Sequence, residues 1–282
     1  MPADEAMPPV VVAYVPRDRA RAWAKRLAGK RSGKITLART LDEFRAVFHH
    51  ELVDVALVDI GAGNGTDGAA ALAREYPTVA FLAIASLRAA ESPMLARCAE
   101  LEFADLLVES VDDDVARELL TRYAYSTRFG QALSPPPPVL GLESALHRAT
   151  WGYLVSHGGR PALTSAIAAA LGVTREHLSR SFGTGRAPTL KRVIDLVRLL
   201  SAAELSKNPG YDVGDVARVL RYSSSTHLSS TATRLIGRRA SSLSALRGVD
   251  VVERFAREHA ANGRFPPMSS LAPSPPLRHG DR

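Results

Sequence analysis

Residues 164 to 235 carry the feature that most constrains the fold of this chain. One short pattern of apolar and polar residues occurs there twice. Each copy predicts a short helix with a buried face, a tight turn, and a second helix with one apolar stripe. An apolar helix predicted over Thr189 to Leu205 joins the two copies. This arrangement predicts an all-α domain in the second half of the chain.

The first copy begins with Ile167, Ala168 and Leu171, which share one face of a helix. Gly172 can adopt the positive φ of a tight turn, and Thr174 is a good N-cap for the next helix. We expect that helix to bury Leu178 and Phe182 and to expose Arg175, Glu176, Ser179 and Arg180. An exposed face with two arginines, on a helix fixed by a turn, suits contact with the bases of DNA.

The second copy repeats the buried face at Val216, Ala217 and Leu220, with Tyr222 at the corner and Ser223 as the candidate N-cap. Its second helix is predicted to bury Leu228, Ala232 and Leu235. The residues expected to face outward are Ser224, Ser225, Thr226, His227, Ser230 and Arg234. Arg238 and Arg239 follow Gly237, in a place that suits contact with phosphates. These side chains can form hydrogen bonds with bases or with the DNA backbone.

Two such units joined by one helix resemble the AraC-type DNA-binding domain, over roughly residues 141 to 248. The matching segments are Val173–Phe182, Val216–Leu220 and Tyr222–Leu228. The resemblance implies a pair of helix-turn-helix units that bind double-stranded DNA. Arg221 departs from it, since the family usually has a glycine at this turn position. A left-handed residue other than glycine costs about 1–2 kcal/mol, so we expect a reshaped second turn.

The distribution of charge agrees with a nucleic-acid partner. The formal net charge of the chain is +7. Residues 1–140 contain 16 Lys and Arg against 19 Asp and Glu, whereas residues 141–282 contain 20 against 10. The excess of positive charge therefore lies in the half that holds the two repeated units. Basic surfaces bind polyphosphates through the release of counterions.

The first half alternates short apolar strands with helices. Strands are predicted over residues 10–15, 34–38, 53–60, 79–85 and 105–108, and helices over 19–27, 41–50, 69–76, 95–101 and 115–129. This alternation predicts an α/β fold, with a five-stranded parallel sheet that is covered on both faces.

Five strands and five helices resemble the receiver domain of response regulators. Asp59, at the end of the third strand, matches the phosphate-accepting aspartate, and Ser86 matches the hydroxyl residue after the fourth strand. The acidic pair that would bind a divalent cation is replaced by Val15-Pro16-Arg17, and Glu109 replaces the lysine of the fifth strand. The resemblance therefore implies a degenerate receiver, a sensory or assembly module. We interpret Asp59 as a strand-end aspartate that loop amides satisfy, in preference to a phospho-acceptor.

Two alternatives stay open at this point. Gly63 to Gly68 fits the GxGxxG pattern between a strand and a helix, which would suit a nucleotide-dependent enzyme. The glycines serve a flexible turn equally well, and we prefer that interpretation. The other alternative is an interaction protein that has lost DNA binding. The histidines are too scattered for a metal site, and we expect no catalytic residues and no cofactor.

We divide the chain into a receiver-like domain (1–132), a proline-rich linker (133–139), a DNA-binding domain (140–262) and a disordered tail (263–282). Cys98 is the single cysteine, so no disulfide can form within the chain. The acidic, proline-rich N-terminal segment is unlike a signal peptide, and no apolar run would span a membrane. We therefore expect a cytoplasmic protein. Its partners would be double-stranded DNA and, through the receiver-like domain, a second copy or another regulatory protein.

Overall fold

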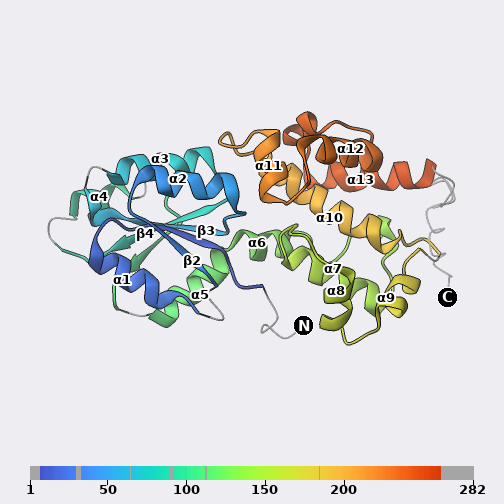
Figure 1. The fold of residues 1–282 in the computed structure, drawn as a ribbon, viewed down its shortest axis with the longest axis horizontal. Helices are drawn as coiled ribbons and strands as arrows, with labels where there is room; N and C mark the ends of the chain where they lie inside the picture. The colour runs from blue at the N-terminus through green and yellow to red at the C-terminus, as the bar shows by residue number, and fades with distance from the viewer. Residues whose placement is uncertain are drawn as a thin grey trace, which may run out of the picture.

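The computed structural model describes residues 7–29, 33–63, 65–88, 92–98, 100–111, 113–183 and 185–261. An α/β half and a helical half lie side by side (Figure 1). The predicted disordered tail at 263–282 lies outside the described residues. Within them, no helix combines the length and the apolar character that a membrane span requires.

The α/β half contains one five-stranded parallel sheet, as the sequence predicts. Its strands are β1 (Val11–Tyr14), β2 (Ile35–Ala38), β3 (Val55–Asp59), β4 (Ala80–Ala85) and β5 (Asp105–Val108). Their order across the sheet is β2-β1-β3-β4-β5. Every residue of β1, β3 and β4 is buried, which explains why these segments are nearly continuous apolar runs.

Helices cover both faces of the sheet (Figure 1). They are α1 (Asp18–Leu27), α2 (Leu41–His50), α3 (Gly65–Glu75), α4 (Ser92–Arg97) and α5 (Asp113–Tyr123), with a short 3₁₀ turn, η2 (Ile60–Ala62), after β3. Because side chains alternate along a strand, β1 packs Val11 and Ala13 with α1 and α5, and Val12 and Tyr14 with α2 and α3. The predicted helix over 95–101 begins earlier, at Ser92, and ends at Arg97.

The single closing helix predicted over 115–129 is wrong. Two helices occupy this stretch, α5 and α6 (Tyr125–Ala132), and they are separated at Ala124, which has φ −54° and ψ 134°. The amides of Tyr125 and Ser126 donate to Asp54, at its carbonyl (3.1 Å) and its carboxylate (2.9 Å) respectively. The chain therefore leaves the helical path where its amides bind the loop before β3.

The second half is helical. Its elements are η4 (Pro138–Leu140), α7 (Ala145–Ser156), α8 (Thr164–Ala170), α9 (Arg175–Ser181), α10 (Leu190–Leu205), α11 (Val213–Val219), α12 (Ser225–Ile236), η5 (Ala240–Ala245) and α13 (Gly248–His259). The predicted joining helix is confirmed as α10, which is buried around most of its circumference. A helix that is apolar on most sides belongs inside a domain, and α8–α9 and α11–α12 lie on opposite sides of α10 (Figure 1).

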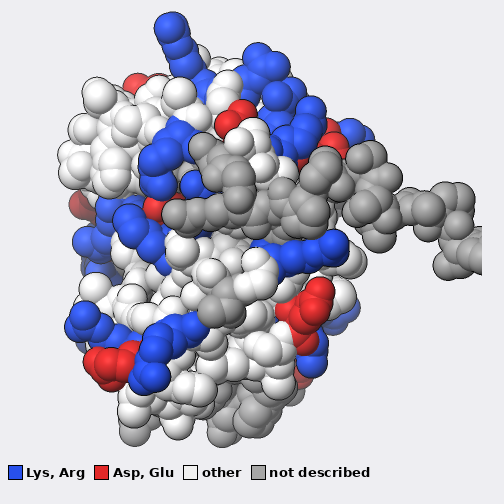
Figure 2. Space-filling model, turned by 90° about the vertical axis from the view of Figure 1, so that its right-hand side faces the viewer, with Lys and Arg blue, Asp and Glu red and all other residues white. Residues whose placement is uncertain are grey.

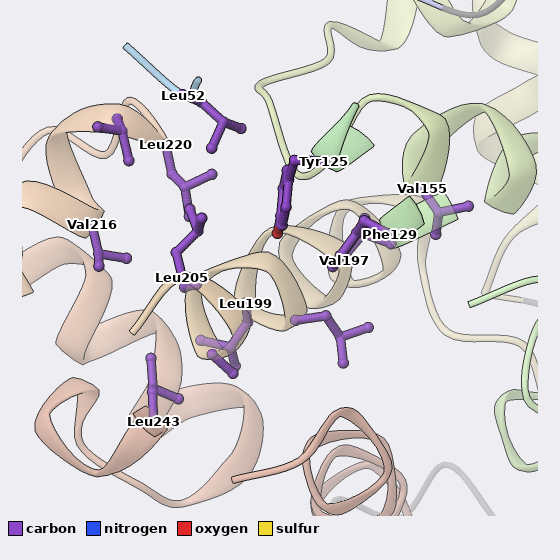
Figure 3. Close-up of a cluster of buried hydrophobic side chains, with 14 of the residues drawn as sticks. Leu52, Tyr125, Phe129, Val155, Val197, Leu199, Leu205, Val216, Leu220 and Leu243 are labelled. Atoms are coloured by element: carbon purple, nitrogen blue, oxygen red, sulfur yellow. The ribbon is translucent and has the colours of Figure 1, made fainter. Parts of the chain in front are cut away.

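One hydrophobic core runs through both halves. It extends from the sheet and α2 through Tyr125 and Phe129 of α6 to the residues of α10. Figure 3 shows the rings of Tyr125 and Phe129 beside the helix that carries Val197 and Leu199. The hydroxyl of Tyr125 forms a 2.9 Å hydrogen bond with Ser201 of α10. Helix α6 also packs against α7, so the end of the predicted receiver-like domain is built into the helical half.

Polar contacts join the two halves at a second place, where α11 packs against α2. Asn208 accepts from the amide of Thr78 (3.0 Å) and donates to its hydroxyl (2.8 Å). The ring centroids of Tyr76 and Tyr211 lie 4.9 Å apart in an edge-on arrangement. The halves are therefore held in one arrangement by specific bonds as well as by apolar packing.

Candidate nucleic-acid interface

The turns of the two helix pairs have the same backbone geometry. Gly172 has φ +65°, and Arg221, at the matching position, has φ +54°. In each turn the next residue donates its amide to a carbonyl five residues back, at 3.0 Å for Val173 and 2.8 Å for Tyr222. The expected reshaping of the second turn is therefore wrong, because Arg221 adopts the left-handed conformation that a glycine would take.

Arg198 of α10 explains how this strained turn is held. One terminal nitrogen of its guanidinium donates to the carbonyls of Leu220 (2.9 Å) and Arg221 (3.3 Å). The guanidinium also lies over the ring of Tyr222, 4.0 Å from the centroid, in a cation–π contact. The turn is thus fixed to the buried joining helix from both sides of Arg221.

Helix α9 has the predicted form. Thr174 caps it, accepting the amide of His177 at 3.1 Å. Leu178 and Phe182 are buried, and the residues predicted to face DNA are all exposed: Arg175, Glu176, Ser179 and Arg180. His147 of α7, which the sequence analysis did not single out, bonds the carbonyl of Ser181 at 2.7 Å and fixes the end of this helix.

Helix α12 starts one residue later than predicted. Its N-cap is Ser224, which accepts the amide of His227 at 3.0 Å, and Ser223 instead bonds the ring of His227. The second unit thus has one more residue between turn and helix than the first. The other residues predicted to face outward are exposed: Ser225, Thr226, His227, Ser230 and Arg234. The hydroxyl of Ser230 donates to the carbonyl of His227, so it already has a partner within the helix.

The arginines of the second unit differ in their surroundings. Arg234 forms a 2.8 Å ion pair with Asp195 of α10, a carboxylate whose side chain is only 9% exposed. Arg238 and Arg239 are exposed, and they follow Gly237, which ends α12 with φ +64°. Arg234 is therefore tied to the joining helix, whereas Arg238 and Arg239 extend from the helix end. Figure 2 views the end of the molecule that carries α9 and α13, and on its described surface Lys and Arg cover more area than Asp and Glu.

The site at the end of β3 contains an internal cation. Asp59 is fully buried at the end of β3. The Nε atom of Arg17 donates to both oxygens of Asp59 (2.9 and 2.8 Å), and the amide of Gly61 donates to one of them at 3.0 Å. Our expectation that loop amides satisfy Asp59 is therefore incomplete, since most of its bonds come from a guanidinium.

Glu109 shares this cation. A terminal nitrogen of Arg17 lies 3.4 Å from Glu109, and Arg19 pairs with the same carboxylate at 2.8 Å. Two buried carboxylates are thus neutralised by two arginines, Arg17 in the loop after β1 and Arg19 in the first turn of α1. Asp18 turns away from the site to pair with Arg39. Burial, and then the charge of Asp59, raise the pKa of the neighbouring Tyr14 hydroxyl.

The described residues include no group of three or more His, Cys, Asp and Glu side chains that could hold a metal ion. Ser86 follows β4 and is half-buried. Of the glycines between positions 63 and 68, Gly63 lies in the turn after β3, whereas Gly65 and Gly68 lie within α3. Gly63 has φ +75°, and a Cβ atom on Gly68 would lie 2.7 Å from a methyl group of Leu41. Gly68 therefore permits α3 to pack closely on Leu41 of α2.

Comparisons with known proteins give little beyond this geometry. No family model matches the chain, and no curated protein matches it. Among solved structures, full-length FixJ from B. japonicum is similar over 76% of this chain and 96% of that chain, with 12% identity and a TM-score of 0.36. These values are too low to assign a family or a function, and the fold class stated above rests on the strand order and the helices.

Proposed function

We propose that this chain is a cytoplasmic, sequence-specific regulator of transcription that binds double-stranded DNA. Helices α9 and α12 would be its recognition helices. The observation that carries the proposal is the pair of helix–turn–helix units with matching turn geometry, which lie on opposite sides of the buried helix α10 (Figure 1). Proteins with such units place the second helix of each unit in the major groove.

The exposed residues divide into two roles under this proposal. Arg175 lies at the start of α9, where recognition helices come nearest to the base edges, and Arg180 is exposed near the end of the same helix. Arg238 and Arg239 would contact phosphates next to the second unit. Arg234, which is paired with Asp195, would position α12 and offer the exposed part of its guanidinium to the DNA backbone.

Selection of bound sequences from random DNA, with the full chain, tests the proposal. Arg175→Ala and Arg180→Ala should each relax the preference at particular base pairs, because an arginine that binds guanine contributes roughly 1–3 kcal/mol of discrimination. Arg238→Ala and Arg239→Ala should weaken binding to all sequences and flatten the salt dependence by about 0.9 per lost phosphate contact.

Arg122→Ala, on α5 of the α/β half, is the matched control, since it removes an exposed arginine far along the chain from both units. This variant should change neither the base preference nor the salt dependence of DNA binding. If the wild-type chain enriches no sequence, and if none of the four variants changes its affinity for DNA, then this protein is an interaction protein that does not bind DNA. Titratable binding of a dinucleotide would favour the enzyme alternative, although the contact of Gly68 with Leu41 gives that glycine a packing role.

The α/β half would act as a sensory or assembly module without magnesium-dependent phosphorylation. The support for this part is the position of Arg17, which bonds both oxygens of Asp59. Signals would then reach the DNA-binding half through ligands or protein contacts, with a second copy of the chain or another regulatory protein as the partner.

A further inference from the structure

A large cavity lies where the two halves meet, away from Asp59 and from the exposed face of α9. It has a volume of about 1400 Å³ and is bounded by α6, the proline-rich segment 135–139, the end of α10, and α13. Its walls are mostly apolar, and they include Phe129, Leu133, Val139, Leu200, Val252 and Ala256. Pockets for drug-sized ligands usually measure about 300–1,000 Å³, so this cavity has room for a sizeable organic molecule.

The lining of the cavity contains two carboxylates and three cations. Glu204 pairs with Lys207 at 2.5 Å, and Glu253 pairs with Arg257 at 3.9 Å. The remaining cation of the lining is Arg128 of α6, whose guanidinium donates to the carbonyl of Thr78 at 2.5 Å. Among the described residues, Arg128 forms no ion pair with a carboxylate, so the lining has one cation in excess.

We propose that this cavity binds an organic anion with a large apolar body. The carboxylate or equivalent group would pair with Arg128, and the body would lie against Phe129 and Val252. Charge complementarity favours an anion over a neutral ligand, because a charge-assisted bond to a guanidinium is stronger than a neutral one. The lining comes from both halves, so the ligand would strengthen their contact. The cavity is separate from the proposed DNA interface, so ligand binding can be measured without DNA.

The chain contains its own optical reporter for this cavity. Trp151 is fully buried in α7, and its indole N–H donates to the carbonyl of Leu133 at 2.8 Å. Leu133 lines the cavity. The other tryptophan, Trp23, belongs to the core between α1 and the sheet. A change of fluorescence on ligand binding that disappears in Trp151→Phe and persists in Trp23→Phe would therefore report on the cavity.

Calorimetric titration of the full chain with decanoate, and with decan-1-ol as the uncharged probe of equal chain length, tests the proposal. We expect decanoate to bind more tightly than decan-1-ol. Arg128→Gln should weaken the binding of decanoate at least tenfold and leave that of decan-1-ol unchanged. Arg122→Gln, on the preceding helix, is the matched control and should change the affinity for neither decanoate nor decan-1-ol.

Two further variants separate loss of the cavity from loss of the fold. Ala256→Trp should fill the cavity and abolish the binding of both probes. Val249→Glu replaces a valine of the lining that is 51% exposed, so the fold should persist while the added charge weakens decanoate binding alone. Equal affinity for the two probes, or binding of neither, would overturn the proposal. So would a concentration-dependent dimer that Ala256→Trp disrupts, since a second copy of the chain would then occupy the groove.

Discussion

At the scale of single residues, the most consequential contact is that of Arg17 with Asp59 and Glu109. Both carboxylates are buried, and the side chain of Arg17 is only 21% exposed. A buried carboxylate is costly unless a cation or hydrogen bonds compensate it. Arg17 compensates Asp59, and Arg17 and Arg19 together compensate Glu109, within the chain itself.

We predict that Arg17→Met destabilises the protein strongly. Removing one partner of a buried ion pair costs roughly 3–5 kcal/mol, because the other charge stays buried without compensation. The measurement is the free energy of unfolding from urea titration. Arg39→Met is the matched control: Arg39 pairs with the largely exposed Asp18, and an exposed pair contributes only about 0–1 kcal/mol. Equal losses in the two variants would contradict our interpretation of the site.

The same contact predicts the outcome of a chemical test. Acetyl phosphate with Mg²⁺ should not phosphorylate the protein, because the guanidinium of Arg17 binds the oxygens of Asp59 that would have to attack. Intact-mass spectrometry of the treated chain is the measurement. A phosphoryl adduct that disappears in Asp59→Ala would show that Arg17 leaves the site and that Asp59 is a true phospho-acceptor.

At the scale of elements, the two turns form a natural matched pair. Gly172 and Arg221 share the left-handed conformation, and a Cβ atom on Gly172 would have open space around it. A substitution there consequently changes backbone strain and little else. The turn therefore has the same geometry with glycine or with arginine at this position. The two residues differ in backbone strain, which changes the free energy of folding.

We predict opposite effects for exchanges at these two positions. Gly172→Ala should destabilise the protein by about 1 kcal/mol, since a left-handed residue other than glycine costs about 1–2 kcal/mol and part of this is recovered from the unfolded state. Arg221→Gly should relieve that strain and stabilise it slightly, by less than about 1 kcal/mol, because glycine also loses more entropy on folding. Thermal unfolding gives both values. Destabilisation by Arg221→Gly would mean that its side chain contributes more than the strain costs.

At the scale of the whole molecule, the shared core predicts that the two halves unfold together. Arg160 of the helical half pairs with the fully buried Asp54 of the α/β half at 2.5 Å, and Asp54 also accepts the amides of Val10 and Ser126. This cluster connects the residues just before β1 and β3 with α6 and with the loop between α7 and α8. Cooperative unfolding follows because neither half can open without exposing part of the other's core.

The tryptophans provide the test, since Trp23 lies in the α/β half and Trp151 in the helical half. Trp23→Phe leaves Trp151 as the fluorescent reporter, and Trp151→Phe leaves Trp23. In urea unfolding of each variant, the transition seen by the remaining tryptophan should coincide with the transition seen by circular dichroism. Arg160→Met should shift both reporters together, by roughly 3–5 kcal/mol. Arg218→Met is the control and should have a small effect, because Arg218 is 51% exposed although it too contacts the α/β half, donating to the carbonyl of His49. Separate transitions for the two reporters would contradict the shared core.

Local patterns in the sequence predict most of the helices and strands of this protein, although they miss the break between α5 and α6. Alternating apolar strands and helices predict the parallel sheet, and the repeated pattern predicts both helix pairs and the helix between them. Thr174, Leu178 and Phe182 occupy the predicted positions. These features follow from residues within a few positions of each other, because helix periodicity, strand alternation and capping are local interactions. Local patterns also explain why the exposed face of α9 could be assigned residue by residue.

The partners of the polar side chains depend on how distant parts of the chain pack together. Asp59 bonds Arg17, 42 residues away, and Arg234 bonds Asp195, 39 residues away. The break at Ala124 follows from bonds to Asp54, and the cap of α12 moved from Ser223 to Ser224 within a run of equivalent serines. Composition and spacing cannot specify which distant charge a buried carboxylate will meet. The partner depends on how the sheet, α6 and α10 pack. Burying a charge without a partner costs free energy, so the fold is stable only when the packing brings opposite charges together.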